Sequence, residues 1–226
     1  MTPKLHKTRF DDDNLLFSEQ FGDHYFSRHD GSAECQHVFM AGNDLPERWS
    51  HKTNFIIGEL GFGTGLNFLV TWRAWIQNRR PSQQLTFVSV EGFPLDSGSA
   101  GRALGQWPEF AQLADTLLSR WQEISDPIHL DAQTILHVHH LPVEQALADF
   151  PKVDAWYLDG FAPSKNPDMW SKSVMHSIAR LTALEGTFAS YTAAGWVRRN
   201  LAEAGFDVEI RPGFGTKRHM IAGELR

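Results

Sequence analysis

The stretch from Phe55 to Asn67 constrains the fold more than any other part of this sequence. A short apolar run ends at Glu59, and glycine then occupies every second position, at Gly61, Gly63 and Gly65. Apolar residues follow at the three- and four-residue spacing of a helix: Leu69, Trp72 and Ile76. The pattern predicts a strand, a tight turn and a helix. Because glycine has no Cβ, the turn backbone can lie against a ligand, and the helix start offers free N–H groups.

The glycine spacing and the acid before it bear on which ligand the turn binds. A dinucleotide fingerprint has a wider gap before its third glycine, where a pyrophosphate is seated. Glu59 stands two residues ahead of Gly61, where a carboxylate would repel a pyrophosphate. It suits a cationic ligand such as S-adenosylmethionine, which carries an ammonium and a sulfonium group. The pattern resembles the first motif of class I methyltransferases, and a glycine-rich turn without a ligand is the plain alternative.

The composition is that of an ordinary globular protein. Hydrophobic residues make up 42% of the 226 residues, which is enough for a full core. The single cysteine, Cys35, forms no internal disulfide and suits a reducing compartment. No run approaches the ~20 apolar residues of a membrane span, and Met1–Lys7 lacks the apolar part of a signal peptide. We therefore expect a soluble cytoplasmic protein. The net charge of −6 argues against a generally basic nucleic-acid coat, but not against a local basic patch.

Two further strands are expected to end in acids at the same edge as Glu59. The run Leu85–Gly92 contains Glu91 near its end, and the run from Val153 ends in Asp159. The spacing between these runs fits helical crossovers, which join parallel strands. Open parallel sheets bind ligands at the carboxyl ends of their strands. Glu91 is therefore predicted to hold ribose hydroxyls, with an exposed loop acid as the alternative, and Phe93 to lie against an adenine or in the core.

The remaining segments predict a Rossmann-like α/β domain over residues 51–226, after a small β-rich extension over residues 1–50. The extension shows three short strand-like runs, Leu15–Phe17, Tyr25–Phe26 and Val38–Met40. Further strands of the domain are expected at Thr134–His139, Gly186–Thr192, Phe206–Ile210 and His219–Leu225. The last two are joined too closely for a helical crossover, so they form an antiparallel hairpin. Helices are expected over residues 97–123, broken at Pro108, and from Asn166 onward. The result is a seven-stranded sheet with a closing antiparallel hairpin.

No metal site is expected from this sequence. His137 and His139 point to one face of their predicted strand, but no cysteine or carboxylate completes a ligand set at a suitable spacing.

Four stretches together resemble a known family: Ser18–Phe21, Glu59–Leu69, Val153–Trp170 and Ala193–Gly223. The run Leu158–Trp170 is far more specific than any glycine loop. On these residues the chain resembles the methyltransferase half of the MnmC family, the bifunctional tRNA 5-methylaminomethyl-2-thiouridine biosynthesis proteins. The resemblance spans nearly the whole chain. It implies the class I methyltransferase fold and S-adenosylmethionine as methyl donor.

The resemblance also implies the substrate and the residues that act on it. The substrate is the 5-aminomethyl group of the wobble (2-thio)uridine in tRNA, methylated on its nitrogen. Asp159 is expected to orient the amine and accept its proton, with a structural role at the Gly160 turn as the alternative. The expected cofactor-binding residues are Glu59, Gly61, Phe62, Gly63, Gly65, Asn67, Glu91, Phe93 and Asp159. The expected tRNA-binding residues are Phe161, Pro163, Lys165, Arg198, Arg199, Lys217 and Arg218, for which core packing or solvated charge is the alternative.

The family also carries features that this sequence lacks. Full-length members have a C-terminal FAD-dependent oxidoreductase half that prepares the amine. No second dinucleotide fingerprint occurs here, so no FAD is expected in this chain, and an oxidoreductase domain or protein is an expected partner. The family tends to have an acid for the adenine amino group where this chain has Leu141. Two other functions stay open from the residues: an NAD-type oxidoreductase, or a domain that binds tRNA or a partner without catalysis.

Overall fold

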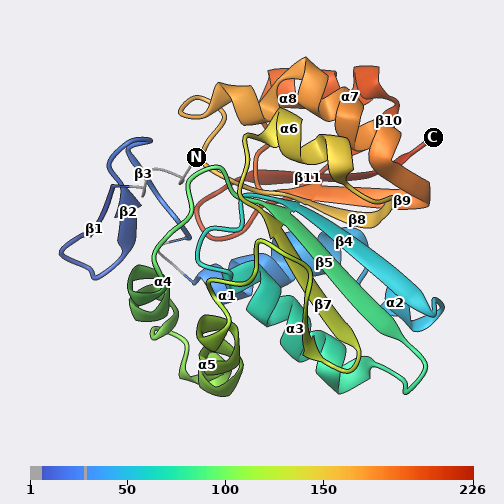
Figure 1. The fold of residues 1–226 in the computed structure, drawn as a ribbon. Helices are drawn as coiled ribbons and strands as arrows, with labels where there is room; N and C mark the ends of the chain where they lie inside the picture. The colour runs from blue at the N-terminus through green and yellow to red at the C-terminus, as the bar shows by residue number, and fades with distance from the viewer. Residues whose placement is uncertain (1–6, 28–29) are drawn as a thin grey trace.

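Eight strands form one mixed sheet, and three short strands form a second sheet (Figure 1). The computed structural model describes residues 7–27 and 30–226. The strand order in the large sheet is β10-β11-β9-β8-β4-β5-β7-β6. In chain order its strands are β4 (Asn54–Leu60), β5 (Gln84–Val90), β6 (Ile128–Asp131), β7 (Thr134–His139), β8 (Val153–Leu158), β9 (Thr182–Ser190), β10 (Phe206–Pro212) and β11 (His219–Leu225).

The middle strands of the large sheet are parallel and end at the same level. β4 pairs in parallel with both β5 and β8, and Glu59 is paired with Ser89 on one side and Tyr157 on the other. Every residue of β8 is buried, as expected for a strand covered on both faces. Because the strands end level, the residues that follow β4, β5 and β8 come together at one edge of the sheet.

Helices cover both faces of the large sheet (Figure 1). On one face lie α3 (Leu66–Asn78), α4 (Ser97–Leu104) and α5 (Ala111–Ser119), and on the other lie α6 (Val143–Ala146), α7 (Lys172–Leu181) and α8 (Gly195–Ala204). Each face has its own apolar core. Trp75 and Phe87 lie in the first core, and Trp156 and Ile178 lie in the second. The single-turn helices that join these elements are η3 (Pro108–Phe110), η4 (Leu147–Asp149) and η5 (Pro167–Trp170).

The prediction of seven strands in the large sheet is wrong by one, because β6 was missed. Its four residues pair antiparallel with β7 at the edge of the sheet, and only Ile128 among them is buried. Such a short strand carries no readable alternation. Its last residue is fixed by α3, since Trp72 Nε1 and Arg79 Nη1 donate to the Asp131 carboxylate at 3.0 and 2.7 Å. The predicted closing hairpin is confirmed, because β10 and β11 pair antiparallel.

The described part of the first fifty residues contains three short strands followed by a run of short helices. The small sheet contains β1 (Thr8–Phe10), β2 (Leu16–Ser18) and β3 (Asp23–His24). The strand predicted at Val38–Met40 is wrong, because these residues lie in a π-helical turn, η1 (Gln36–Met40). This turn continues α1 (Gly31–Cys35) and leads through η2 (Ala41–Asn43) to α2 (Glu47–Ser50). Cys35, Val38 and Phe39 are buried in the first core, and a run of three apolar residues is too short to reveal a helical period.

Two other sequence predictions differ from the structure in position. Tyr25–Phe26 follows β3 instead of forming a strand. The helix predicted from Asn166 is divided into η5 and α7, and Ser171 caps α7 by accepting from the Val174 N–H at 3.3 Å. Residues 1–6 of the predicted extension, where a signal peptide was judged absent, lie outside the described residues. In residues 7–27 and 30–226, no helix is both long enough and apolar enough to cross a membrane.

Candidate active site

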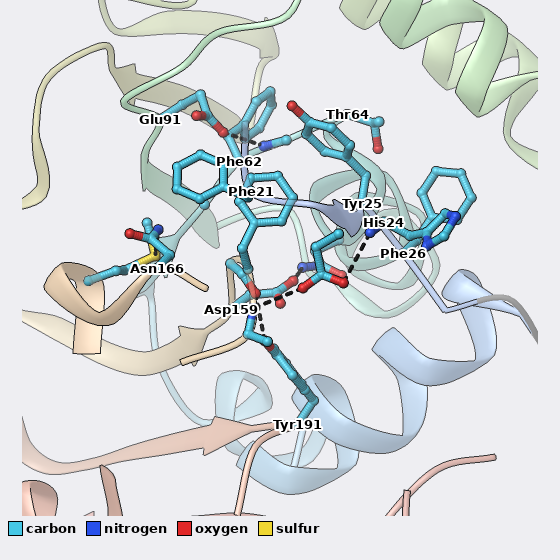
Figure 2. A pocket seen from close by; sticks show the side chains of 18 of the residues that line it. Phe21, His24, Tyr25, Phe26, Phe62, Thr64, Glu91, Asp159, Asn166 and Tyr191 are labelled. Atoms are coloured by element: carbon cyan, nitrogen blue, oxygen red, sulfur yellow. Dashed lines mark hydrogen bonds between the residues drawn. The ribbon is translucent and has the colours of Figure 1, made fainter. Parts of the chain in front are cut away.

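A cavity of about 910 Å³ lies at the edge of the sheet where β4, β5 and β8 end (Figure 2). Its floor is formed by the segments that follow these strands, which include Gly61, Glu91 and Asp159. Its walls come from distant parts of the chain: the small sheet and the residues after it, α1, and the β10–β11 turn at Lys217. Its size is within the range of small-molecule sites.

Two glycines of the loop after β4 have left-handed backbone that shapes the cavity floor. Gly61 has a φ of +83° and Gly63 a φ of +54°. A Cβ on Gly61 would lie 3.0 Å from the Gly160 Cα, so the loops after β4 and β8 can approach this closely only with glycine here. A Cβ on Gly63 would lie 3.2 Å from Tyr25 Cδ1. The alternating glycines therefore serve both the turn and its contacts with neighbouring segments.

Glu91 follows β5 and is fixed by the backbone. Its Oε2 accepts from the Gly63 N–H and its Oε1 from the Phe93 N–H, both at 2.8 Å. Burial raises the pKa of this carboxyl above its ordinary value, and the two backbone N–H groups oppose that rise. A carboxylate has about four lone-pair sites. Glu91 therefore keeps acceptor capacity toward the cavity for ligand hydroxyl groups.

Asp159 follows β8 and points into the cavity, and the pKa of its carboxyl group is raised. Burial raises the pKa of this carboxyl from 3.8 to about 7, against the opposing effect of a hydrogen bond from Asn67 Nδ2 to Asp159 Oδ2 at 2.7 Å. Glu34 raises this pKa further and Lys217 lowers it. A carboxyl whose pKa is near 7 can exchange a proton at neutral pH, which is the property of a general acid or base.

Glu59 lies behind the cavity and does not line it. The side chain is fully buried. Its Oε1 accepts from Asn67 Nδ2 at 3.0 Å, and its Oε2 accepts from Ser89 Oγ at 2.6 Å. Burial raises the pKa of Glu59 well above its ordinary value, and the charge of Asp159 raises it further. Glu59 is therefore connected to the cavity through Asn67, which does line it.

Aromatic side chains from distant parts of the chain meet between Glu91 and Asp159 (Figure 2). Phe161 stacks on Phe21, with ring centroids 4.5 Å apart and an interplanar angle of 23°. Tyr25 meets Phe161 edge-on at 5.1 Å, and Phe93 meets Phe21 edge-on at 5.2 Å. These rings offer flat apolar surfaces of the kind on which a nucleobase stacks.

Lys217 reaches the cavity from the β10–β11 turn. Its Nζ is 2.7 Å from Glu34 Oε1 and 3.9 Å from the ring centroid of Tyr191. Tyr191 follows β9 and donates from its hydroxyl to the Gly160 carbonyl at 2.7 Å. The turn between the last two strands therefore folds back over the site and is tied to α1.

The structure brings together some of the predicted site residues and separates others. The predicted residues that line the cavity are Gly61, Phe62, Gly63, Asn67, Glu91, Phe93, Asp159, Phe161 and Lys217. Those that lie outside the lining are Glu59, Gly65, Pro163, Lys165, Arg198, Arg199 and Arg218. Lys165 forms an ion pair with Asp23, with Nζ 3.4 Å from Oδ1. Leu141, where an adenine-binding acid was sought, is exposed beside the lining residues Pro142 and Val143.

Sequence reasoning missed Phe21, Tyr25, Glu34 and Tyr191, which all line the cavity. Phe21 lies within one of the stretches that resemble the family, but no role was assigned to it. Tyr191 lies within the strand that was predicted over Gly186–Thr192, whereas the structure ends β9 at Ser190 and Tyr191 follows it. Glu34 and Tyr25 gave no signal, because only the tertiary fold carries the first forty residues to the sheet edge.

The cavity is acidic. Among the described residues its lining holds five carboxylates and one lysine, Lys217, the carboxylates being Asp23, Glu34, Glu91, Asp159 and Asp168. This charge favours a cationic ligand and opposes a pyrophosphate. In residues 7–27 and 30–226, no group of three histidine, cysteine or acidic side chains is arranged to hold a metal ion.

Comparison with known proteins shows which family this chain belongs to. Residues 108–226 match a family described as S-adenosyl-L-methionine-dependent methyltransferase. A protein of Chromohalobacter salexigens, named tRNA 5-methylaminomethyl-2-thiouridine biosynthesis bifunctional protein MnmC, is 42% identical over 99% of this chain. A protein of the same name from Nitrosospira multiformis is 45% identical over 93% of it. The chain spans 33% and 35% of these two relatives.

A solved structure shares the fold. The crystal structure of MNMC2 from Aquifex aeolicus aligns with a TM-score of 0.79, covers 100% of this chain and 72% of that one, and is 23% identical.

The residues present fit S-adenosylmethionine. The ligand is a cation, which suits the acidic lining, and its ribose hydroxyls suit the acceptor capacity of Glu91. A cofactor with a pyrophosphate would meet five carboxylates, so the charge of the cavity argues against an NAD-type oxidoreductase. The family match argues against it as well. From the family match over more than half of its length, the chain belongs to the S-adenosyl-L-methionine-dependent methyltransferases.

Proposed function

We propose that this chain is the tRNA methyltransferase that converts the 5-aminomethyl group of a wobble (2-thio)uridine into 5-methylaminomethyl-(2-thio)uridine. The names of the MnmC relatives contain this product, which supports the substrate. The observation that carries the proposal is the Asp159 carboxyl, whose pKa of about 7 suits proton transfer and which shares the cavity with the ring of Phe161.

The cofactor would be held by the loops after β4 and β5. Gly61 and Gly63 provide a close-lying backbone, and Glu91 provides acceptors for the ribose hydroxyls. Phe93 and the backbone around Leu141 and Pro142 lie where an adenine would be held without a carboxylate. When bound, S-adenosylmethionine supplies a methyl group activated by attachment to a sulfonium sulfur.

Asp159 would prepare the amine for this transfer. An alkyl amine with a pKa of ~10.4 is mostly protonated at neutral pH and has no lone pair to offer. The ionised Asp159 carboxylate can orient the ammonium and accept its proton, directly or through a water molecule. The walls of the cavity then hold the free amine in line with the methyl group, and such positioning lowers the barrier by several kcal/mol in general, up to about 7–11.

The aromatic cluster would hold the uridine. The stacking of Phe21 on Phe161 at 4.5 Å places a flat ring where a pyrimidine can take the same geometry. Pro163 is buried next to this loop and supports its shape rather than facing the cavity. A base on Phe161 would present its 5-substituent within the cavity that also contains Asp159.

Basic residues near the same sheet edge would contact the tRNA backbone. Arg198 and Arg199 are the fourth and fifth residues of α8, and a Cβ on Gly195 would lie 3.4 Å from Arg199 Nη1 and 3.9 Å from Arg198 Nη2. Both guanidinium groups therefore fold over the N-terminal turn of α8, where free N–H groups also favour a phosphate. Arg218 is exposed on the β10–β11 turn. Lys165 and Lys217 are paired with Asp23 and Glu34, so their contribution would require these pairs to open.

The place of the chain in a larger reaction sequence follows from its relatives. They are named bifunctional and are about three times as long, so a second activity resides outside the matched third. We propose that an FAD-dependent oxidoreductase domain or protein supplies the free amine in the cytoplasm, where tRNA is modified.

The proposal is tested by methyl transfer from radiolabelled S-adenosylmethionine to tRNA from cells that lack this modification. The wild-type chain should label this tRNA and should not label fully modified tRNA. Asp159→Asn should lower the rate by about 100- to 10,000-fold, the usual contribution of a general base, with cofactor affinity kept within a few-fold. Asp207→Asn removes an exposed acid that pairs with Arg226 and serves as the matched control. Absence of label with a cofactor-binding wild type would instead indicate a binding domain without catalysis.

A further inference from the structure

We infer that Asn67 is a positioning residue that ties the carboxylate of Asp159 to the buried Glu59 and so sets the orientation and acidity of the base. This assigns Asn67 and Glu59 to the control of Asp159 instead of to direct contact with the cofactor. The inference rests on the proposed function, because it takes Asp159 as the general base.

The first observation is the geometry of one amide between two carboxyl groups. Asn67 Nδ2 lies 2.7 Å from Asp159 Oδ2 and 3.0 Å from Glu59 Oε1. An amide nitrogen carries two hydrogens, so both are used, one toward each carboxyl group. Ser89 Oγ donates to the other Glu59 oxygen at 2.6 Å. The result is a continuous chain of hydrogen bonds from β5 through the end of β4 and the start of α3 to the end of β8.

The second observation is the position of Glu59. This side chain has an exposed fraction of 0% and does not line the cavity. Its two oxygens are occupied by Asn67 and Ser89. A fully buried carboxyl group with two donors is suited to hold another side chain in place, and it is poorly suited to reach a ligand on the far side of Asn67.

The third observation is how firmly Asn67 itself is held. It lies in the first turn of α3, two residues after the left-handed Gly65 at the N-cap position. Its carbonyl accepts from Thr71 Oγ1 at 2.7 Å, and Thr71 Oγ1 also lies 3.1 Å from the hydroxyl of Tyr157 in β8. The amide is thus fixed by its own backbone, by Glu59 and by the packing of α3 on the sheet.

These contacts have a chemical consequence for the base. A hydrogen bond donated to a carboxylate favours its charged form. Asn67 therefore offsets part of the desolvation that makes Asp159 a weaker acid, and it fixes the position of the Asp159 Oδ2 atom at the cavity wall. Without the anchor on Glu59, the amide would be free to turn away from Asp159.

The inference is tested by the pH dependence of kcat/KM, which reports ionisations of the free enzyme. The variants are Asn67→Ala, Glu59→Gln and the matched control Asn78→Ala, which makes the same change on α3 at an exposed residue that donates to the Ala74 carbonyl. Asn67→Ala should raise the midpoint near pH 7 by about one unit, since a hydrogen bond to a charged group is worth roughly that much. Its affinity for S-adenosylmethionine, measured by calorimetry, should stay within a few-fold of wild type.

Glu59→Gln should keep the wild-type midpoint. Glutamine retains an oxygen that accepts from Asn67, and its amide nitrogen can donate to the Ser89 hydroxyl. Asn78→Ala should match wild type in both measurements. If Asn67→Ala does not fold by thermal melting, Asn67→Ser provides the same measurement, because its hydroxyl is too short to join both carboxyl groups.

Two results would overturn the inference. The first is an unchanged midpoint in the Asn67 variant with a large loss of cofactor affinity, which would make Asn67 a cofactor ligand. The second is a Glu59→Gln variant that loses cofactor binding while keeping its stability. Failure of the proposed function would give a different result. Asp159→Asn would then retain wild-type turnover, independently of the pH profiles of the Asn67 variants.

Discussion

A valine at Gly63 is expected to disturb the cofactor site more than the fold. Gly63 has a φ of +54°, a conformation that costs an L-residue about 1–2 kcal/mol and is least tolerated by a β-branched side chain. The new Cβ would also lie 3.2 Å from Tyr25 Cδ1, so the ring must move by a few tenths of an ångström. For a protein of this size, each kcal/mol lowers Tm by about 2–4 °C. The backbone strain alone should therefore lower Tm by about 2–8 °C.

The effect of Gly63→Val on binding should be larger. The Gly63 N–H donates to Glu91 Oε2 at 2.8 Å and holds this carboxylate where the ribose is expected. A shifted backbone and two methyl groups at the cavity wall would remove this bond. Hydrogen bonds to charged groups contribute about 1.5–3 kcal/mol, so the Kd for S-adenosylmethionine should rise about 10- to 150-fold.

Gly22 provides the matched control. Its φ is +61°, and a Cβ there would have no atom within 4 Å. Gly22→Val therefore introduces similar backbone strain without the contact to Tyr25 and outside the cavity lining. The assay is calorimetric titration with S-adenosylmethionine after thermal melting of both variants without ligand. Equal affinities for the two folded variants would refute the assignment of the glycine loop to the cofactor.

Three further predictions follow from the charges in and around the cavity. With a pKa of about 7 for Asp159, kcat/KM should rise about tenfold per pH unit below pH 7 and then level off. It should fall again near the substrate amine's pKa of ~10.4. A continuous rise of kcat/KM past pH 9 would contradict the role of Asp159 as the base. Because the folded-state pKa of Asp159 lies above its ordinary 3.8, ionising this group costs stability as pH rises from about 4 to 7. Asp159→Asn should therefore raise Tm relative to wild type at pH 8 but much less at pH 4. An equal difference in Tm between variant and wild type at the two pH values would contradict this explanation. Substitution of Arg198 and Arg199 by glutamate should weaken tRNA binding and leave the affinity for the cofactor unchanged. The slope of the logarithm of tRNA affinity against the logarithm of salt concentration should become shallower by about one unit per lost phosphate contact. Identical slopes for wild type and variant would mean that the tRNA binds elsewhere.

Much of the sheet could be predicted from the sequence, because its signals are local. The parallel strands are short apolar runs bounded by glycine, acid or proline, and the helices between them show an apolar period of three and four. The connection after Ile210 is too short for a crossover, and that length alone indicated the antiparallel hairpin. β6 was missed because four edge residues carry no period. Val38–Met40 was misplaced because its apolar side chains are buried by a helical run instead of a pleated strand.

The candidate site was predictable only where it follows the strands. Glu91 and Asp159 come directly after buried strands, so their position at one edge followed from parallel pairing. The direction of a side chain could not be read in this way. Glu59 belongs to the same motif as Gly61, yet its position in the strand turns it into the interior, and Asn67 takes its place in the lining. The pairing of Glu34 with Lys217 joins residues 183 positions apart, and no local pattern encodes it.

The position of β11 has a consequence for how the polypeptide assembles during synthesis. β11 follows β9 and β10 along the chain, but it lies between them in the sheet. While residues 219–225 are still within the ribosome, β9 has an unpaired edge whose backbone groups can recruit other strands. β10 joins the sheet only through β11, which pairs with β10 on one side and β9 on the other, and the turn that carries Lys217 to the cavity is completed when β11 is inserted. A nascent chain should therefore acquire its ligand-binding cavity only after β11 has emerged from the ribosome.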